Sequence, residues 1–134
     1  MPVVLPPSTL IEPAWDDLLP GTADGERRVR ERCAALWLKL SPVMSRSIGL
    51  VFEQQECLVE YCIHTARIEQ MERQLSIEGL IVQGQRGDVK NPLVTVLNQY
   101  RAHRRGLTAE LGLSPSTAAR LVRPDQQDDD DPFD

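Results

Sequence analysis

Apolar residues recur every three or four positions along most of the chain, the spacing of a helix with a buried face. A first helix is predicted from Asp24, its N-cap, to about Leu40, with Val29, Cys33 and Leu36 on the buried side. A second, longer helix is predicted for residues 50–78. It carries two apolar stripes. One consists of Cys57, Tyr61, His64, Ile68, Met71 and Leu75, and the other of Phe52, Val59, Cys62, Ile63 and Ala66. Two stripes indicate burial on more than one side, within the protomer and against another subunit.

A third helix is bounded by recognisable signals. Asn91 is predicted to cap it, Pro92 to occupy its first position and Gly112 to end it. Its apolar positions are Leu93, Leu97, Tyr100, Leu107 and Leu111. Residues 79–91 leave the helical period, and their glycines predict a loop or a short hairpin. Ser114 and Pro115 predict a last short helix that stops before Pro124.

These elements predict an all-α fold with two long helices and shorter ones. Residues 1–23, with five prolines, are predicted to be a mostly extended arm whose Trp15, Leu18 and Leu19 are able to dock on a neighbour. Residues 24–122 are predicted to be a helical core and oligomerisation domain, and 123–134 a disordered acidic tail. Only 4% of the 134 residues are aromatic, so the core is small, and oligomerisation is a common remedy for a marginal core.

Charge is distributed unevenly along the chain, whose net charge is −5. Of the 20 acidic residues, six lie in residues 125–134 and four in residues 1–24, whereas all 15 Lys and Arg lie in between. A mildly basic body between acidic ends suggests a polyanionic partner. The alternative is an ordinary solvated surface with a tail that aids solubility.

Two sets of basic residues are candidate phosphate contacts. The first lies on or just before the third helix and comprises Lys90, Arg101, Arg104 and Arg105. The rival set lies on the first helix and comprises Arg27, Arg28, Arg30 and Arg32. Either set gains strength if a closed ring of identical copies repeats it. Otherwise these residues are solvated helix faces or partners of acidic residues.

No pattern of residues predicts catalysis, a cofactor or a bound metal. Cys57, Cys62 and His64 lack the spacing of a zinc site and fall on apolar stripes. Three cysteines, the lack of a signal peptide and the lack of a long apolar run predict a reduced, cytoplasmic protein with no membrane partner.

The segment "AHRRGLTAELGLSPSTAARLVRP", residues 102–124, has the turn chemistry of a DNA-binding helix-turn-helix. Its second helix is short and mostly apolar, with Ala118, Ala119, Leu121 and Val122, and six aspartates follow. A reading helix offers polar side chains to base edges. We therefore interpret the segment as a corner between helices, and keep a transcriptional regulator and a helical protein–protein adaptor as alternatives.

An ordered series of motifs resembles the small subunit of tailed-phage terminases. It consists of Gly79, Gly87, Asn91–Pro92, "ELGLSP" at 110–115 and Arg120–Leu121, with "ALW" at 35–37 and "EYC" at 60–62. The resemblance implies a non-enzymatic subunit in the bacterial host cytoplasm. It also implies a homo-oligomeric ring of roughly seven to ten copies. Such a subunit binds double-stranded viral DNA and recruits or stimulates a large subunit that holds the ATPase and nuclease. We expect its ring contacts on the second and third helices, at Phe52, Val59, Tyr61, Ile68, Met71, Leu75, Leu93, Leu97 and Tyr100.

Overall fold

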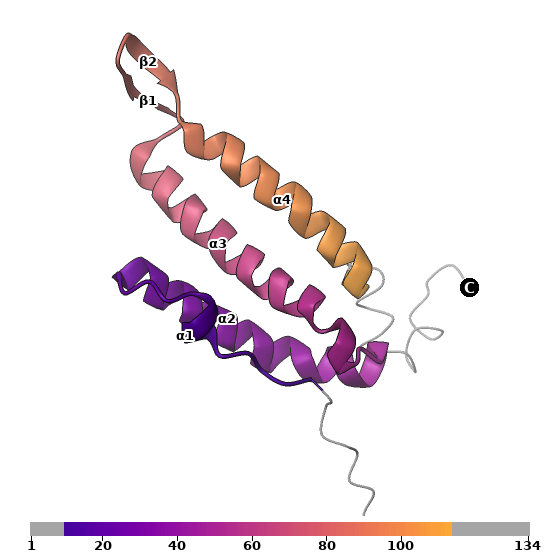
Figure 1. Ribbon diagram of the computed structural model, residues 1–134. Coiled ribbons are helices and arrows are strands. Elements are labelled where there is room, and N and C mark those ends of the chain that lie inside the picture. The colour runs from indigo at the N-terminus through magenta and orange to yellow at the C-terminus, as the bar shows by residue number, and fades with distance from the viewer. Residues whose placement is uncertain (1–9, 114–134) are drawn as a thin grey trace, which may run out of the picture.

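The protein is built mainly of helices that lie side by side (Figure 1). The structure is a computed structural model, and it describes residues 10–113. In chain order its elements are α1 (Trp15–Leu18), α2 (Asp24–Val43), a π-helical turn (Met44–Ile48), a 3-10 turn (Phe52–Gln54), α3 (Glu56–Glu78), β1 (Ile81–Gly84), β2 (Gly87–Lys90) and α4 (Pro92–Leu111). The predicted helical fold is therefore present, with the small hairpin that residues 79–91 allowed.

The long helix α3 lies between α2 and α4 of its own chain (Figure 1). One of its apolar stripes contributes Leu58, Cys62 and Ala66 to the main core, which also contains residues of α2. The other stripe faces α4, and a second, smaller core contains Ile68, Met71 and Leu97, flanked by Leu75, Leu93 and Tyr100. The two-sided pattern of α3 is thus accounted for within one protomer. It does not by itself require a neighbouring subunit, contrary to our interpretation of the sequence.

The junction between α2 and α3 differs from the sequence prediction. The first helix does not end at about Leu40 but continues to Val43, with Pro42 in its last turn, and a wider π-helical turn follows it directly. Gly49 ends that turn with a φ of 76°, a left-handed conformation that glycine adopts without steric cost. The second helix begins at Glu56, later than the predicted residue 50, because the 3-10 turn intervenes. Asp24 is the first residue of α2, not its cap, and Ala23 occupies the cap position.

The segment before α2 packs on its own protomer. Trp15 and Leu19 are buried in the main core, and the Trp15 ring meets Trp37 edge-on with centroids 6.2 Å apart. The Trp15 indole N–H also donates to a Glu12 carboxylate oxygen at 2.8 Å. Leu18 differs from Trp15 and Leu19, since 49% of it is exposed. The prediction that Trp15 and Leu19 dock on a neighbour is therefore wrong, because α2 of the same chain offers the apolar surface that covers them.

The connection between α3 and α4 is a two-stranded antiparallel hairpin that extends past the ends of both helices (Figure 1). Its register pairs Ile81 with Lys90, Val82 with Val89 and Gly84 with Gly87. Gly84 is required here, since a Cβ would lie 2.8 Å from a Val89 methyl carbon. The predicted last helix from Ser114, the start of the arm and the acidic tail lie outside the described residues.

Candidate nucleic-acid interface

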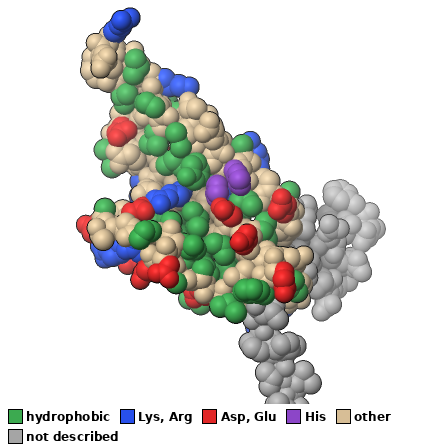
Figure 2. All heavy atoms as spheres, in the orientation of Figure 1, with side chains coloured by type: hydrophobic (Ala, Val, Ile, Leu, Met, Phe, Trp, Pro, Cys, Tyr) green, Lys and Arg blue, Asp and Glu red, His purple; other side chains and the backbone are tan. Residues whose placement is uncertain are grey.

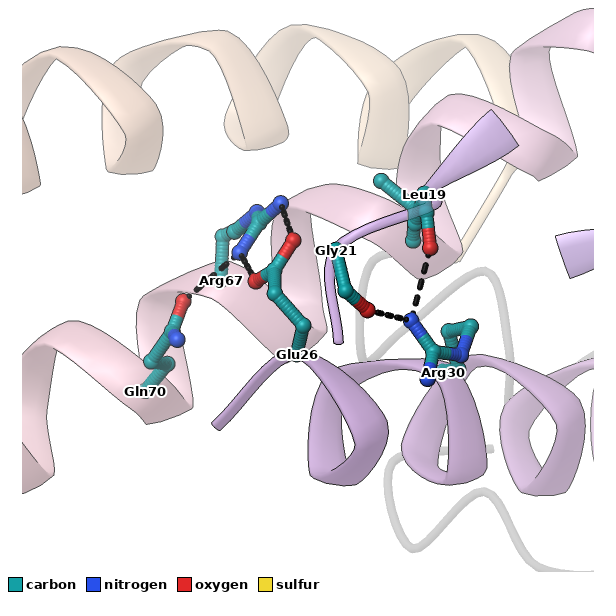
Figure 3. Close-up of polar contacts among 6 residues, drawn as sticks. All are labelled: Leu19, Gly21, Glu26, Arg30, Arg67 and Gln70. Atoms are coloured by element: carbon teal, nitrogen blue, oxygen red, sulfur yellow. Dashed lines mark hydrogen bonds and ion pairs between the residues drawn. The ribbon is translucent and has the colours of Figure 1, made fainter. Parts of the chain in front are cut away.

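The arginines of α2 are mostly engaged in contacts that hold the protein together. Arg30 donates from one guanidinium nitrogen to the backbone carbonyls of Leu19 at 2.7 Å and Gly21 at 2.5 Å (Figure 3). It also lies 3.3 Å from a carboxylate oxygen of Asp16, and its side chain is only 19% exposed. Arg30 therefore fixes the α1 segment onto α2 and is not free to contact a phosphate.

Two further members of this basic set have acidic neighbours. Arg27 lies 3.3 Å from Asp24 and 4.0 Å from Glu31, all on the same helix. Arg32 donates to the Glu69 carboxylate of α3 at 2.9 Å. Arg28 alone among the four is exposed with no ion-pair partner within residues 10–113. The rival set predicted from the sequence is thus largely neutralised by the fold.

A second contact between α2 and α3 was not anticipated from the sequence. Arg67 donates to both carboxylate oxygens of Glu26, at 2.9 Å for one pair, and also to the Gln70 side-chain oxygen at 2.9 Å (Figure 3). The hydrogen bond from Arg67 holds the pKa of the Glu26 carboxyl below its ordinary value of 4.5, although burial acts in the opposite direction. The same bond raises the pKa of Arg67. No local pattern could reveal this pair, since 41 positions separate the two residues.

The basic residues of α4 are in a different situation. Arg101 forms an ion pair with Glu72 of α3. Arg104 and Arg105 have no ion-pair partner among the residues that the structure describes, and Arg105 is exposed whereas Arg104 is half-buried on the apolar stripe. Lys90 is exposed on β2, before the start of α4. About 18 Å of helix separates the start of α4 from Arg104, so the structure does not gather Lys90 with the other three.

An aromatic and acidic cluster adjoins this part of α4. The His103 ring stacks on His64 of α3 with centroids 4.5 Å apart, and His64 also contacts the Tyr100 ring at 5.0 Å. The Nδ1 atom of His64 lies 2.9 Å from the backbone carbonyl of Glu60 and 3.4 Å from its carboxylate. Figure 2 shows the two histidines together at the surface with acidic side chains beside them. This face is therefore of mixed charge. On α4, Arg104 and Arg105 are the basic residues without an ion-pair partner in the described part of the chain.

Comparison with known proteins identifies the family of the chain. The profile of the family described as phage terminase, small subunit, matches residues 34–128, which is well over half of the chain. The chain belongs to this family. No curated protein and no solved structure was found to match it. Terminase small subunits are typically the non-catalytic, regulatory partners in phage DNA packaging.

In this terminase small-subunit family member the cysteines are neutral thiols at ordinary pH. Burial raises the pKa of Cys33 to about 11 and that of Cys62 to about 12. Burial and the hydrogen bond to the Glu110 carboxylate, at 3.3 Å, raise the pKa of Cys57 to about 11. A thiol is a nucleophile or metal ligand only as the thiolate, which these environments disfavour. Within residues 10–113 no group of three side chains is arranged to hold a metal ion.

The apolar positions proposed for subunit contacts occupy different environments in this terminase family member. Most of them lie in the contact between α3 and α4 or against the main core, namely Val59, Tyr61, Ile68, Met71, Leu75, Leu93, Leu97 and Tyr100. Phe52 differs from these because 48% of it is exposed. Other large apolar side chains that the sequence analysis did not single out are more exposed, among them Leu38, Ile77, Leu80 and Ile81.

No helix within the described residues has the length and apolar character needed to cross a membrane.

Proposed function

We propose that this chain is the DNA-binding, non-catalytic subunit of a phage packaging terminase. In this proposal it binds double-stranded viral DNA in the cytoplasm of the bacterial host. It also recruits or stimulates the large subunit that carries the ATPase and nuclease. The family match over residues 34–128 is the observation that carries the proposal. The small subunit acts as a homo-oligomeric ring of roughly seven to ten copies, so that modest positive charge is repeated around it.

The DNA-contacting set that we propose is centred on Arg104 and Arg105, with Arg28 as a further candidate. These side chains are supported by their lack of acidic partners within the described residues, since a charge already paired inside the protein gains less from a phosphate. Arg101 is a weaker candidate because Glu72 competes for its guanidinium. Phosphate contacts of this kind position the subunit on DNA without reading its sequence.

The experiment is a charge reversal with a matched control. We expect Arg104→Glu with Arg105→Glu to weaken binding to phage DNA at 0.1 M salt. We expect the slope of log affinity against log salt to decrease by about 2 per subunit, because two phosphate contacts are lost. Lys39→Glu with Arg73→Glu changes the net charge equally at exposed positions on α2 and α3, and serves as control.

Each result has a distinct meaning. Equal loss in both double variants contradicts a specific role for Arg104 and Arg105, and leaves a general charge effect. If the wild-type protein fails to retain DNA even at low salt, DNA binding itself is contradicted and a protein–protein adaptor remains. A native mass spectrum of the wild-type protein tests the ring separately. A dimer in that spectrum contradicts the ring and fits a transcriptional regulator instead.

A further inference from the structure

Exposed apolar side chains are concentrated at the hairpin end of the molecule. Half of the large apolar side chains that are exposed within residues 10–113 belong to the short stretch 77–96, and they are Ile77, Leu80, Ile81, Val89 and Val96. Figure 2 shows apolar side chains along this end of the visible face. Exposed apolar groups that gather at one place mark an interaction surface more often than those that lie singly.

The hairpin has a rigid base although it stands apart from the helices. The Asn91 backbone N–H donates to the Leu80 carbonyl at 2.8 Å. The Asn91 side chain, 3% exposed, donates to the Glu78 carboxylate at 2.9 Å and to the Gly79 carbonyl at 3.0 Å. The sheet has only the strands β1 and β2 in the described part of the chain. A two-stranded hairpin is marginal by itself, and a third or fourth strand with an apolar face stabilises it.

The register determines which backbone groups of β2 face outward. In an antiparallel pair, alternate residues direct their N–H and C=O groups toward the partner strand or away from it. The bond from the Asn91 N–H to the Leu80 carbonyl shows that these two residues direct their backbone groups toward each other. Because such pairs alternate along the strands, Val89 and Val82, two positions away, do the same. The backbone groups of Asp88 and Lys90 consequently point away from β1, where they can accept and donate to another strand.

We propose that β2 pairs antiparallel with β2 of a second copy of this chain, around a two-fold axis at Val89. In this register the outward backbone groups of Asp88 meet those of Lys90 of the second copy, and the reverse pair forms at the same time. Val89 lies opposite its own symmetry mate as a non-hydrogen-bonded pair. Both side-chain pairs beside it are of opposite charge, which is favourable for cross-strand neighbours.

The outer edge of β1 does not offer the same complementarity. A two-fold pairing of β1 around Val82 sets Ile81 against Gln83 of the second copy, with no opposite charges to fix the register. Pairing through β2 also aligns Val82 and Val89 of both copies on one face of a four-stranded sheet, because paired residues share a face. Charge and apolar burial therefore both favour the β2 edge and a second copy as its occupant.

This contact goes beyond the proposed ring and does not depend on DNA binding. A two-fold contact uses the same surface on both subunits, whereas a ring closes through two different surfaces. The hairpins therefore join copies from two rings, or join two protomers where no ring forms. In either case, an assembly in which the hairpins pair contains twice as many copies of the chain as an assembly in which they do not.

The pairing can be trapped by a single cysteine. In the proposed register the two Val89 Cα atoms lie about 4.5 Å apart, within the range that a disulfide spans. We expect Val89→Cys in the full-length chain to form a disulfide-linked dimer under mild oxidation, about tenfold faster than Ser76→Cys. Ser76 is exposed on α3 and reports random collision. The wild-type chain gives the background from its native cysteines.

Charge reversals test the register. In the Val89→Cys background, Asp88→Lys or Lys90→Asp alone is expected to slow cross-linking about fivefold, because two attractive pairs become repulsive. The combination of Asp88→Lys with Lys90→Asp restores opposite charges and is expected to restore the rate. Native mass spectra of the single reversals, with Val89 retained, are expected to show half the wild-type copy number.

The proposal is overturned if Val89→Cys cross-links no faster than Ser76→Cys, or if the double reversal behaves like the single ones. Circular dichroism of each variant separates loss of pairing from loss of folding, and the restored double variant excludes a hairpin that has simply unfolded. If the chain forms no ring but the hairpins pair, the result is different. The wild-type chain is then a dimer, and Asp88→Lys or Lys90→Asp alone converts it to a monomer. Failure of the hairpin pairing leaves the wild-type copy number unchanged by the reversals.

Discussion

The Arg67 guanidinium spans the contact between α2 and α3 and donates to both oxygens of the Glu26 carboxylate. Both side chains are 23% exposed, and Gln70 accepts a further hydrogen bond from Arg67. Because hydrogen bonds to charged groups stabilise more than neutral ones, this pair fixes how the first long helix sits on the second. Arg30 and Arg32 also form ion pairs with residues of other elements, which are Asp16 of α1 and Glu69 of α3.

The Glu26–Arg67 pair predicts a pH dependence of stability. The pKa of Glu26 is lower in the folded chain than its ordinary value of 4.5, so the contribution of the pair is complete above that value. It is lost as the pH falls through the lowered pKa. We expect Glu26→Gln to lower the free energy of unfolding at pH 7 by roughly 2 kcal/mol.

Urea denaturation at several pH values measures both effects. The acid decline of the variant is expected to be shallower than that of the wild-type protein, since one titrating group is gone. Glu31→Gln is the matched control, because Glu31 makes only a long contact of 4.0 Å with Arg27 at the surface, and its effect should stay within about 0.5 kcal/mol. Identical acid limbs for wild type and Glu26→Gln would contradict the assignment.

Asn91 has two roles, and its replacement tests them together. Its side-chain oxygen accepts from the Leu93 N–H at the start of α4, while its amide nitrogen donates to Glu78 and Gly79. We expect Asn91→Ala to lower the free energy of unfolding by about 2 kcal/mol, through loss of the cap and of buried hydrogen bonds. Chemical denaturation measures this change. Asn98→Ala, at an exposed position of the same helix, is expected to change little, and equal effects would refute the role of Asn91.

Trp15 and Leu18 are close in sequence but differ in burial, which gives a third matched comparison. Trp15 is 7% exposed against Trp37, and Leu18 is 49% exposed. Truncating a buried aromatic residue leaves a cavity, so Trp15→Ala should cost about 3 kcal/mol, whereas Leu18→Ala should cost about 0.5 kcal/mol or less. Thermal unfolding monitored by circular dichroism distinguishes them. A larger effect for Leu18 would show that the segment before α2 docks elsewhere, for example on a neighbouring subunit.

The acidic end of the chain predicts an effect on DNA affinity. Residues 125–134 contain six acids and no base. Removing them takes away six negative charges that repel DNA, so we expect nonspecific binding to tighten at low salt and the difference to shrink as salt screens it. Electrophoretic mobility shift with a random duplex measures this. A tail in which the six aspartates are replaced by asparagine keeps the length and should behave like the deletion, and unchanged affinity in both would leave solubility as the role of the tail.

The local part of the fold could be predicted from the sequence. Asn91, Pro92 and Gly112 specify the start and end of α4, because caps depend on neighbouring residues alone, and the structure confirms that the Asn91 side chain accepts from Leu93. The positive φ of Gly49 and the 3-10 turn after it were not predicted, since tertiary packing determines where one helix stops and the next begins.

The identity of the partners of a residue could not be predicted in the same way. Periodicity showed that α3 is buried on two sides, but not that α2 of the same chain covers the second side. Likewise the arginine run at 27–32 looked like one basic surface. The structure directs Arg30 to the backbone of Leu19 and Gly21, and Arg32 to Glu69, through contacts that the chain order does not encode. For that reason the structure was needed to identify which basic residues lack an acidic partner within residues 10–113.

The hairpin and the point where the described chain ends, at Leu113, lie at opposite ends of α4, a helix whose 20 residues span about 30 Å. Leu111 is 1% exposed in the main core, so the C-terminal end of α4 is anchored against α2 and α3, far from the hairpin. The proposed contact between β2 strands lies at the hairpin end of α4, so that contact leaves the Leu111 end of the helix uncovered.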